Sequence, residues 1–216
     1  DDGTVNVMTT VAGQQKNDKL GIVTYSLSNG IKVTVKKTDF KSDEILLEGV
    51  RKGGTSNFGP DDKSNVQFMS DVIESMGYGQ FTPTELGDAL TGKNITLTQS
   101  MDETTDKISG SSSVKDFMSL MELVHLQMTS PRLDTELYEG YMGKMKMQLM
   151  FMKANPQVVF VDTLFKVMYN NNPLRPIAIP TLEDIEKINP ERVVEIYKNE
   201  FGNAYGFHFF LTGNID

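Results

Sequence analysis

The dipeptide Asn29-Gly30 constrains the fold of this chain more than any other short feature. It lies within the run IVTYSLSNGIKVTVKKT (residues 22–38), where apolar and polar residues alternate on both sides. Asn-Gly between alternating apolar residues is the strongest short-range signal for a β-hairpin. The sequence therefore predicts two antiparallel strands near the start of the fold.

The remaining patterns predict an α+β domain with a mostly antiparallel sheet covered by several helices. Apolar residues recur at helical spacing between Val66 and Met76, whereas alternation around Asp102-Glu103 indicates a second hairpin. The other expected elements are a strand over 44–54, a helix over 60–77, a short helix over 82–92, helices over 113–130, 134–154 and 155–170 with breaks at Pro131 and Pro156, two helices over 181–201, and a last strand over 204–216.

The chain is expected to hold one domain. Residues 1–20 are polar and are expected to form a linker, and residues 21–216 form the single domain. A chain of 216 residues is long enough to bury a core of its own. Because it begins Asp-Asp-Gly without a visible signal peptide, we interpret it as a mature product or, in preference, as a piece of a longer protein.

Charge and composition argue against several classes of function. The net charge of −8 and the isoelectric point near 4.9 disfavour a nucleic-acid partner, because phosphate binding needs clustered Lys and Arg. No apolar run approaches the roughly 20 residues that span a membrane. The absence of cysteine excludes disulfides, thiolate zinc sites and cysteine nucleophiles. Neither a nucleotide-binding glycine motif nor a serine nucleophile elbow is present.

The stretch SDVIESMGYG (residues 70–79) carries the candidate chemistry. Asp71, Glu74 and Ser75 are spaced i, i+3 and i+4, so they share one face of the expected helix. Zinc peptidases use this spacing for two histidines with a glutamate between them. Serine is a poor zinc ligand, and a zinc site needs at least three protein ligands. The interpretation as a working zinc site is therefore disfavoured.

The two histidines offer weaker candidates. His125 follows Glu122 by one helical turn, which would suit a metal pair, but a half-buried helix histidine near a surface carboxylate is the favoured interpretation. His208 alternates with phenylalanines and is expected on a strand face. An active enzyme using Asp71, Glu74 and His125 in a novel site would show peptidase activity, and we expect none.

Methionines are concentrated in the long helical region, where they suit either core packing or an adaptable contact surface. Met142, Met145 and Met152 share a helix face with Leu149, and core packing is the favoured interpretation for them. Met147 and Met150 lie elsewhere on the same helix. A contact surface for a neighbouring domain stays open for these two residues.

The order of the elements resembles the pitrilysin/insulinase family of zinc peptidases. Family members have an L-x-N-G hairpin, a strand ending near two small residues, a helix with H-x-x-E-H-M, a second hairpin, a long helix with a glutamate ligand, a Pro-rich loop and a closing G-x-x-D strand. The matching segments of this chain include, in the same order, LSNGIKVTV, LLEGVRKGGTS, DVIESMGYG, ITLTQSMDETTDKISGSS, DIEKINPERVVEIYKNEF and FFLTGNID. The resemblance covers about residues 22–216.

The zinc motif is where the chain departs from the family. The run from Asp71 to Met76 matches H-x-x-E-H-M, so Glu74 holds the position of the general base, and Asp71 and Ser75 replace the two histidine ligands. No acidic residue lies between Glu139 and Asp162, where the resemblance places the third ligand, a glutamate. The resemblance therefore implies no catalytic and no metal-binding residue here, and marks Asp71, Glu74 and Ser75 as a degenerate metal site.

The function that the resemblance implies is that of a noncatalytic domain of a zinc metalloendopeptidase. Longer family members resemble a clamshell of four such domains, and this chain looks like the first domain of the half without zinc. Its expected partners are the catalytic half of the same parent chain, which would hold the zinc, and peptide or unfolded polypeptide. It would form a chamber wall and bind peptide along an edge strand, for which the counterpart is Ile95, Thr96, Leu97 and Thr98.

Three further expectations follow from the same resemblance. The closing GNID leads into a further helix and strand in the family, so the domain is expected to continue past residue 216. The alternative function is a purely structural or docking domain on the same fold. The expected location is the bacterial periplasm or cell envelope.

Overall fold

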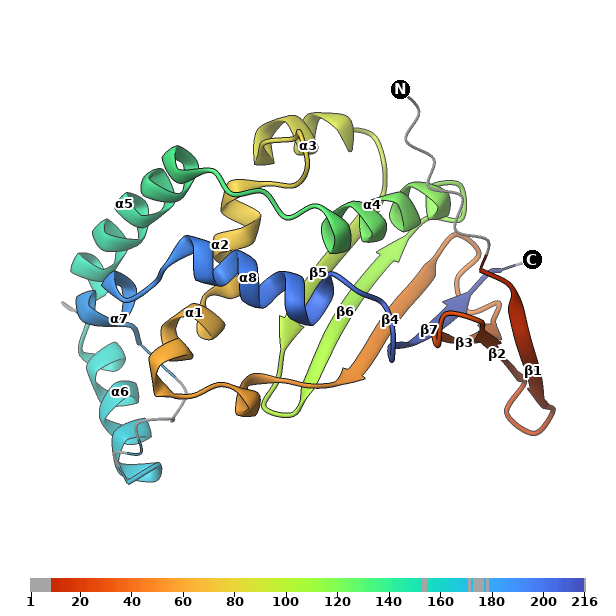
Figure 1. The fold of residues 1–216 in the computed structure, drawn as a ribbon, viewed down its shortest axis with the longest axis horizontal. Helices are drawn as coiled ribbons and strands as arrows, with labels where there is room; N and C mark the ends of the chain where they lie inside the picture. Colours follow the sequence, from red (N-terminus) through yellow and green to blue (C-terminus); the bar gives the residue numbers. More distant parts are fainter. Residues whose placement is uncertain (1–8, 153–154, 171, 173–176, 178, 216) are drawn as a thin grey trace.

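A seven-stranded sheet organises the fold, with its strands in the order β1-β2-β3-β7-β4-β6-β5 (Figure 1). The computed structural model describes residues 9–152, 155–170, 172, 177 and 179–215. Neighbouring strands are antiparallel except β3 and β7, which are parallel, so the predicted mostly antiparallel sheet is confirmed. The strands are β1 (Val11–Asn17), β2 (Ile22–Leu27), β3 (Lys32–Lys37), β4 (Ile45–Lys52), β5 (Ile95–Met101), β6 (Thr105–Ser112) and β7 (His208–Gly213).

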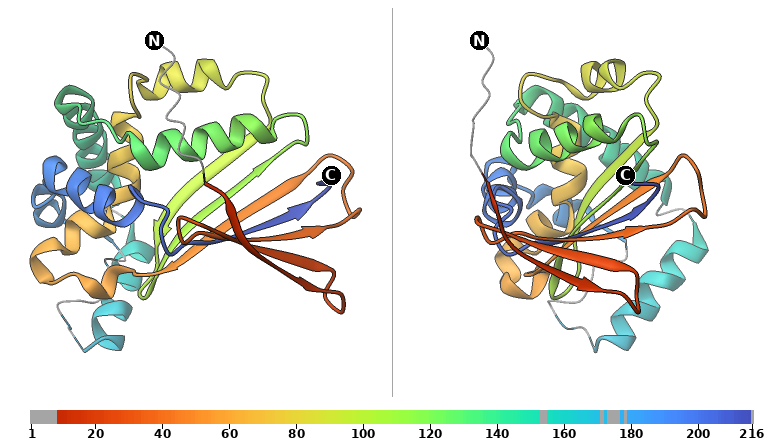
Figure 2. Two further views of the ribbon diagram at one scale, coloured as in Figure 1. Left: turned by 45° about the vertical axis from the view of Figure 1, so that its right-hand side comes forward. Right: turned by 90° about the vertical axis from the view of Figure 1, so that its right-hand side faces the viewer.

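Helices cover the part of the sheet that contains β4, β5 and β6, whereas β1, β2 and β3 extend beyond the helical layer (Figures 1 and 2). No helix in the described part of the chain is long and apolar enough to cross a bilayer. The helices are α1 (Lys63–Gln67), α2 (Met69–Met76), α3 (Pro83–Ala89), α4 (Phe117–Thr129), α5 (Thr135–Met152), α6 (Pro156–Met168), α7 (Leu182–Glu186) and α8 (Pro190–Phe201).

Both predicted hairpins are present. Gly30 has a φ of 82° in the turn between β2 and β3, and its N–H donates to the Leu27 carbonyl at 3.0 Å. The second hairpin joins β5 to β6, with Met101 opposite Asp106. Local turn chemistry was therefore sufficient to predict these two pairings.

The N-terminal segment and the helix over 60–77 differ from expectation. Val11–Asn17, which fell within the expected linker, form β1 and pair with β2. All seven β1 residues are exposed, so the strand has no apolar alternation, and its pairing depends on the free edge of β2. In place of the single helix expected over 60–77, the chain forms a 3₁₀ turn followed by α1 and α2. The two α-helices are separated at Phe68 (φ −105°, ψ 8°). Residues 1–8 lie outside the described residues, and so does most of the Pro-rich loop.

The core lies between the sheet and α2, α4 and α8. Met69, Val72, Ile73 and Met76 of α2 are all fully buried. In α8 the Tyr197 and Phe201 rings lie 5.3 Å apart between centroids, and Phe201 also contacts Phe207, which precedes β7. In α5 only Met142 and Leu149 are buried, whereas Met147 and Met150 are exposed. The methionines of α5 therefore divide between core and surface.

Asp62→Asn is expected to make the stability of the fold less sensitive to acid. Arg192 of α8 donates to both Asp62 carboxylate oxygens, from Nε at 3.0 Å and Nη2 at 2.6 Å, and holds the pKa of Asp62 below its usual value. A carboxyl group whose pKa is lower in the folded chain adds stability above the unfolded pKa of about 3.9, and this stability is lost as the pH falls through the folded pKa.

Urea denaturation between about pH 5 and pH 2 tests this expectation, because that window spans the titration of such a carboxylate. The free energy of unfolding should fall less steeply with acid in Asp62→Asn than in the wild type. Glu183→Gln is the control, since Glu183 pairs with Lys187 on an exposed face of α7. An equal slope in Asp62→Asn and wild type would show that the Arg192 pair does not contribute.

Candidate functional site

The polar face of α2 is only partly available to a ligand. Asp71 is exposed, whereas the Ser75 hydroxyl donates to the Val72 carbonyl of its own helix at 2.7 Å. The hydroxyl proton at this position is thus used within the helix, and a serine hydroxyl is in any case a poor zinc ligand. Asp71, Glu74 and Ser75 do share one face, as their spacing predicts.

Glu74 is the acidic group that the surroundings perturb. Partial burial and the neighbouring Asp71 carboxylate raise the pKa of Glu74. No lysine or arginine among the described residues forms an ion pair with Glu74. Burial also raises the pKa of Tyr78 and Tyr197, and the Tyr197 hydroxyl donates to the Gln127 carbonyl at 2.9 Å. Glu74 is therefore a carboxylate beside neutral phenols, without a cationic partner.

The described residues bring together no group of three His, Cys, Asp or Glu side chains that could hold a metal ion. α5 packs against α2, and the residues it contributes near Asp71 include Tyr141, whose pKa is raised by burial and by the Asp71 charge. His125 and Glu122 are exposed on α4. His208 lies on a strand face, as predicted: its Nε2 lies 2.7 Å from the Thr34 hydroxyl and its ring stacks on Phe210.

β5 is the edge strand of the sheet nearest to α2. Within the described residues it pairs only with β6, and the Asp102 N–H donates to the Thr105 carbonyl at 2.8 Å where the hairpin closes. Peptide groups of an antiparallel strand point alternately toward and away from the partner strand. Counting back from Asp102, the N–H and C=O groups of Ile95 and Leu97 point away from β6. The free edge therefore offers two successive pairs of backbone donors and acceptors.

α2 limits how far this edge is open. The Ser70 hydroxyl donates to the Gln99 carbonyl at 2.6 Å, which is the next outward-pointing group after Leu97. Ser70 and Glu74 are one turn apart on α2, so they lie on the same side of the helix. Ser70 closes the edge at Gln99, and Glu74 lies farther along, toward the open part.

An open cavity of about 430 Å³ joins the free edge to Glu74. The structure thus brings together two candidates that are separated in the sequence, Glu74 and the run Ile95–Thr98. The sequence carries no signal that places α3 at this cavity, because the Thr82–Glu85 capping box marks the start of the helix but not where the helix packs. The lining residues are Glu74, Gly77, Tyr78, Pro83, Leu86, Gly87, Leu90, Ile95, Thr96, Leu97, Thr98, Leu123 and Gln127.

Comparison with known proteins finds similarity to zinc proteases in both sequence and fold. No family model matches the chain. It is 23% identical over 208 residues to a zinc protease PQQL-like protein of Arabidopsis thaliana, covering 95% of this chain and 19% of that protein. The chain spans about a fifth of the length of the curated relatives it matches.

Two solved structures have the same fold. The periplasmic protease PqqL from Escherichia coli superimposes with a TM-score of 0.78 at 13% identity, covering 98% of this chain and 23% of that one. The peptidase M16 inactive domain from Pseudomonas fluorescens superimposes with a TM-score of 0.71 at 15% identity, covering 91% of this chain and 47% of that one. The chain thus has the fold of M16 peptidase domains, and its similarity to zinc proteases and to an inactive M16 domain supports the resemblance that its sequence carries.

Proposed function

We propose that the chain is a noncatalytic domain of a pitrilysin/insulinase-type zinc protease, which holds extended peptide along β5 while another domain of the parent chain cleaves it. The observation that carries this proposal is the free edge of Ile95 and Leu97 beside Glu74, where the family's zinc motif would place its general base. A strand edge binds the peptide main chain more than its side chains, which suits unfolded polypeptide as a substrate.

The place of the domain in the parent protein is part of the proposal. We infer that it is the first domain of the half without zinc, that it forms a wall of the substrate chamber, and that the zinc lies in the catalytic half. The similar Escherichia coli protein is a periplasmic protease, and we propose the periplasm for the parent of this chain as well. Fractionation of cells that make the full-length parent protein tests the location.

A peptide N-methylation series tests the proposed binding mode. An extended fluorescent peptide is methylated at one amide at a time, and its binding to the 216-residue chain is measured by fluorescence anisotropy. Strand addition uses every second peptide N–H, so methylation should abolish binding with a period of two residues. The peptide should stay intact throughout. A uniform response along the peptide, or stoichiometric zinc in elemental analysis of the chain, would overturn the proposal.

Restoring both histidines, in the double variant Asp71→His/Ser75→His, is expected to leave the chain without peptidase activity. Two imidazoles and Glu74 would recreate the sequence motif, but catalytic zinc needs three protein ligands. No acidic residue lies between Glu139 and Asp162 to provide the third. The measurement is cleavage of a quenched fluorescent peptide with added zinc. Cleavage above the wild-type background would show that another residue completes the site.

The alternative, a docking domain, is supported by the surface of α6. None of its residues is buried, and Phe160, Val167 and Met168 are 67%, 73% and 68% exposed. An isolated helix of this length is marginally stable in water, so α6 suits a helix that packs against another domain. The docking function predicts that Phe160→Asp weakens association with the rest of the parent chain. The peptide-binding function predicts unchanged peptide affinity in the same variant.

A further inference from the structure

The cavity beside β5 indicates which peptides this domain selects. We propose that the site prefers extended peptides with a large apolar side chain and, two residues away, a lysine or arginine. The apolar side chain would fill the cavity, and the cation would pair with Glu74. This inference rests on the proposed function, because a peptide must lie along β5 before its side chains reach the cavity.

The walls of the cavity are mainly apolar. Leu86 and Leu90 come from the α3 side, Leu123 from α4, and Ile95 and Leu97 from β5. A cavity of about 430 Å³ is in the size range of small-ligand sites, which are lined mostly by apolar side chains with a few polar groups. Filling such walls with a leucine or phenylalanine side chain removes apolar surface from water, which favours binding. The cavity thus favours an apolar anchor.

Gly87 offers a position at which a side chain can be added beside the cavity. Gly87 lies in α3 and lines the cavity, and a Cβ atom built at this residue would meet nothing within 4 Å. A side chain added here would therefore enter empty space instead of the packed core. This position provides a means of filling the cavity without disturbing the fold.

The preference for a lysine or arginine in the peptide follows from the charge of the cavity. Glu74 is the acidic group of the cavity, and it has no cationic partner among the described residues. Asp71 lies one turn earlier on the same helix face and adds negative charge. A carboxylate at the wall of an apolar cavity attracts a cation that enters the cavity, because the apolar walls exclude part of the water that would screen the pair. A lysine or arginine of the peptide would supply that cation.

The spacing of two residues follows from strand geometry. Side chains on the same face of a strand are two residues apart. Ile95 and Leu97 already show this relation on β5, since both line the cavity and both have outward-pointing backbone groups. Because Ser70 occupies the Gln99 carbonyl, a bound peptide has this short part of the edge to pair with. The apolar and basic side chains must therefore be close neighbours on one face of the peptide.

Peptide variants test the preference without altering the protein. Anisotropy titrations compare a peptide with leucine and arginine two residues apart in a serine-rich background with peptides carrying Leu→Ala, Arg→Gln or Arg→Glu. We expect Leu→Ala to weaken binding about tenfold, in line with an open cavity that buries about half of the surface of the three carbon groups that leucine has beyond alanine. We expect Arg→Glu to weaken it about three- to tenfold, because the substitution removes an ion pair and adds repulsion between two carboxylates. Moving the arginine to the adjacent residue should weaken binding as much as Arg→Gln.

Protein variants locate the two contacts. Gly87→Trp should weaken the binding of the leucine peptide at least about tenfold, because the indole side chain would fill the cavity. Gly140→Trp is the matched control, because Gly140 is also helical with open space around its Cβ position and lies on α5, away from the cavity. The Gly140→Trp variant should bind the leucine peptide with wild-type affinity. Glu74→Gln should remove most of the difference between the arginine and glutamate peptides, with Asp71 accounting for the remainder, while leaving the Leu→Ala effect in place.

The outcomes separate this inference from the proposed function. A period of two in the N-methyl series, with no loss on Leu→Ala or Arg→Glu, would support strand addition and overturn the side-chain preference. Loss of the N-methyl period would overturn strand addition itself. A charge preference of wild-type size in Glu74→Gln would assign the cation to another carboxylate and also overturn the inference.

Discussion

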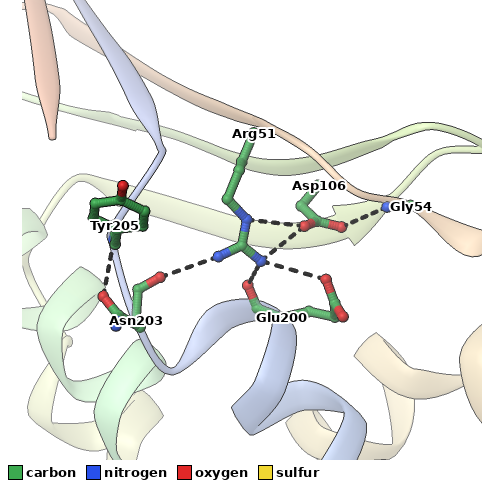
Figure 3. A network of polar contacts seen from close by, with 6 residues as sticks. All are labelled: Arg51, Gly54, Asp106, Glu200, Asn203 and Tyr205. Carbon is green, nitrogen blue, oxygen red and sulfur yellow. Dashed lines mark hydrogen bonds and ion pairs between the residues drawn. The ribbon is translucent and has the colours of Figure 1, made fainter. Parts of the chain in front are cut away.

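Arg51→Met is expected to lower the free energy of unfolding by about 3–5 kcal/mol, the cost of leaving a buried charge without its partner. The Arg51 side chain is 17% exposed and that of Asp106 is fully buried. Arg51 donates to Asp106 Oδ2 from Nε at 3.2 Å and from Nη2 at 2.9 Å (Figure 3). It also donates to the backbone and side chain of Glu200, and its guanidinium lies over the Phe207 ring.

The environment of this network makes the loss of the cation costly. Asp106 Oδ1 accepts the Gly54 N–H at 2.9 Å, so the carboxylate also orders the turn after β4. Burial and the nearby Asp106 charge raise the pKa of Glu200, and Arg51 opposes that increase. Without Arg51 two carboxylates would face each other in a poorly solvated region. Burying an unpaired charge is unfavourable enough that the chain would unfold more readily.

Urea denaturation of two further variants checks the origin of the effect. Arg51→Met/Asp106→Asn should be less destabilised than the sum of its single variants, because the second substitution removes the unpaired charge. Lys187→Met should change the free energy of unfolding far less than Arg51→Met does, as expected for an exposed pair. A loss below about 1 kcal/mol in Arg51→Met would show that water solvates Asp106 and that the pair is not a buried one.

The same network shows what the sequence could not predict. Arg51 lies opposite Asp106 in the register of β4 and β6, and Glu200 reaches it from α8. These residues are 55 and 149 positions from Arg51, so no local pattern connects them. The hairpin at Asn29-Gly30 was predictable because the turn is encoded by adjacent residues. The Arg51 pairing depends on strand register and helix docking, which emerge only when the whole sheet has formed.

Some features of the candidate site could likewise be predicted from local sequence, whereas others depend on packing between distant elements. Spacing alone placed Asp71, Glu74 and Ser75 on one helix face, because i, i+3 and i+4 positions are neighbours on a helix. The family resemblance suggested Ile95–Thr98 as an edge strand, and β5 is indeed the edge of the described sheet. The α3 wall of the cavity had no signal in the sequence, because its position depends on packing across separate elements. The strand β1 likewise had no signal in the sequence, because all of its residues are exposed and show no apolar alternation.

Gly77→Ala is expected to destabilise the chain by about 3 kcal/mol or more, the combined cost of backbone strain and steric overlap. Gly77 ends α2 with φ 88° and ψ −167°, a region that is almost restricted to glycine. A Cβ atom here would overlap the Phe81 carbonyl oxygen. The backbone cannot easily move aside, because the Gly77 N–H donates to the Ile73 carbonyl at 3.0 Å and its carbonyl accepts from Arg132 at 3.2 Å.

Gly87→Ala provides the matched comparison, since both glycines line the same cavity but only Gly77 has a positive φ. Alanine in an exposed helical position should stabilise the chain by about 0.5–1 kcal/mol relative to glycine. Opposite signs of the two changes in urea denaturation would therefore separate backbone strain from cavity volume. A Gly77→Ala chain that unfolds at the wild-type urea concentration would mean that the turn after α2 relaxes. In that case the position of Glu74 relative to β5 would not depend on the conformation of Gly77.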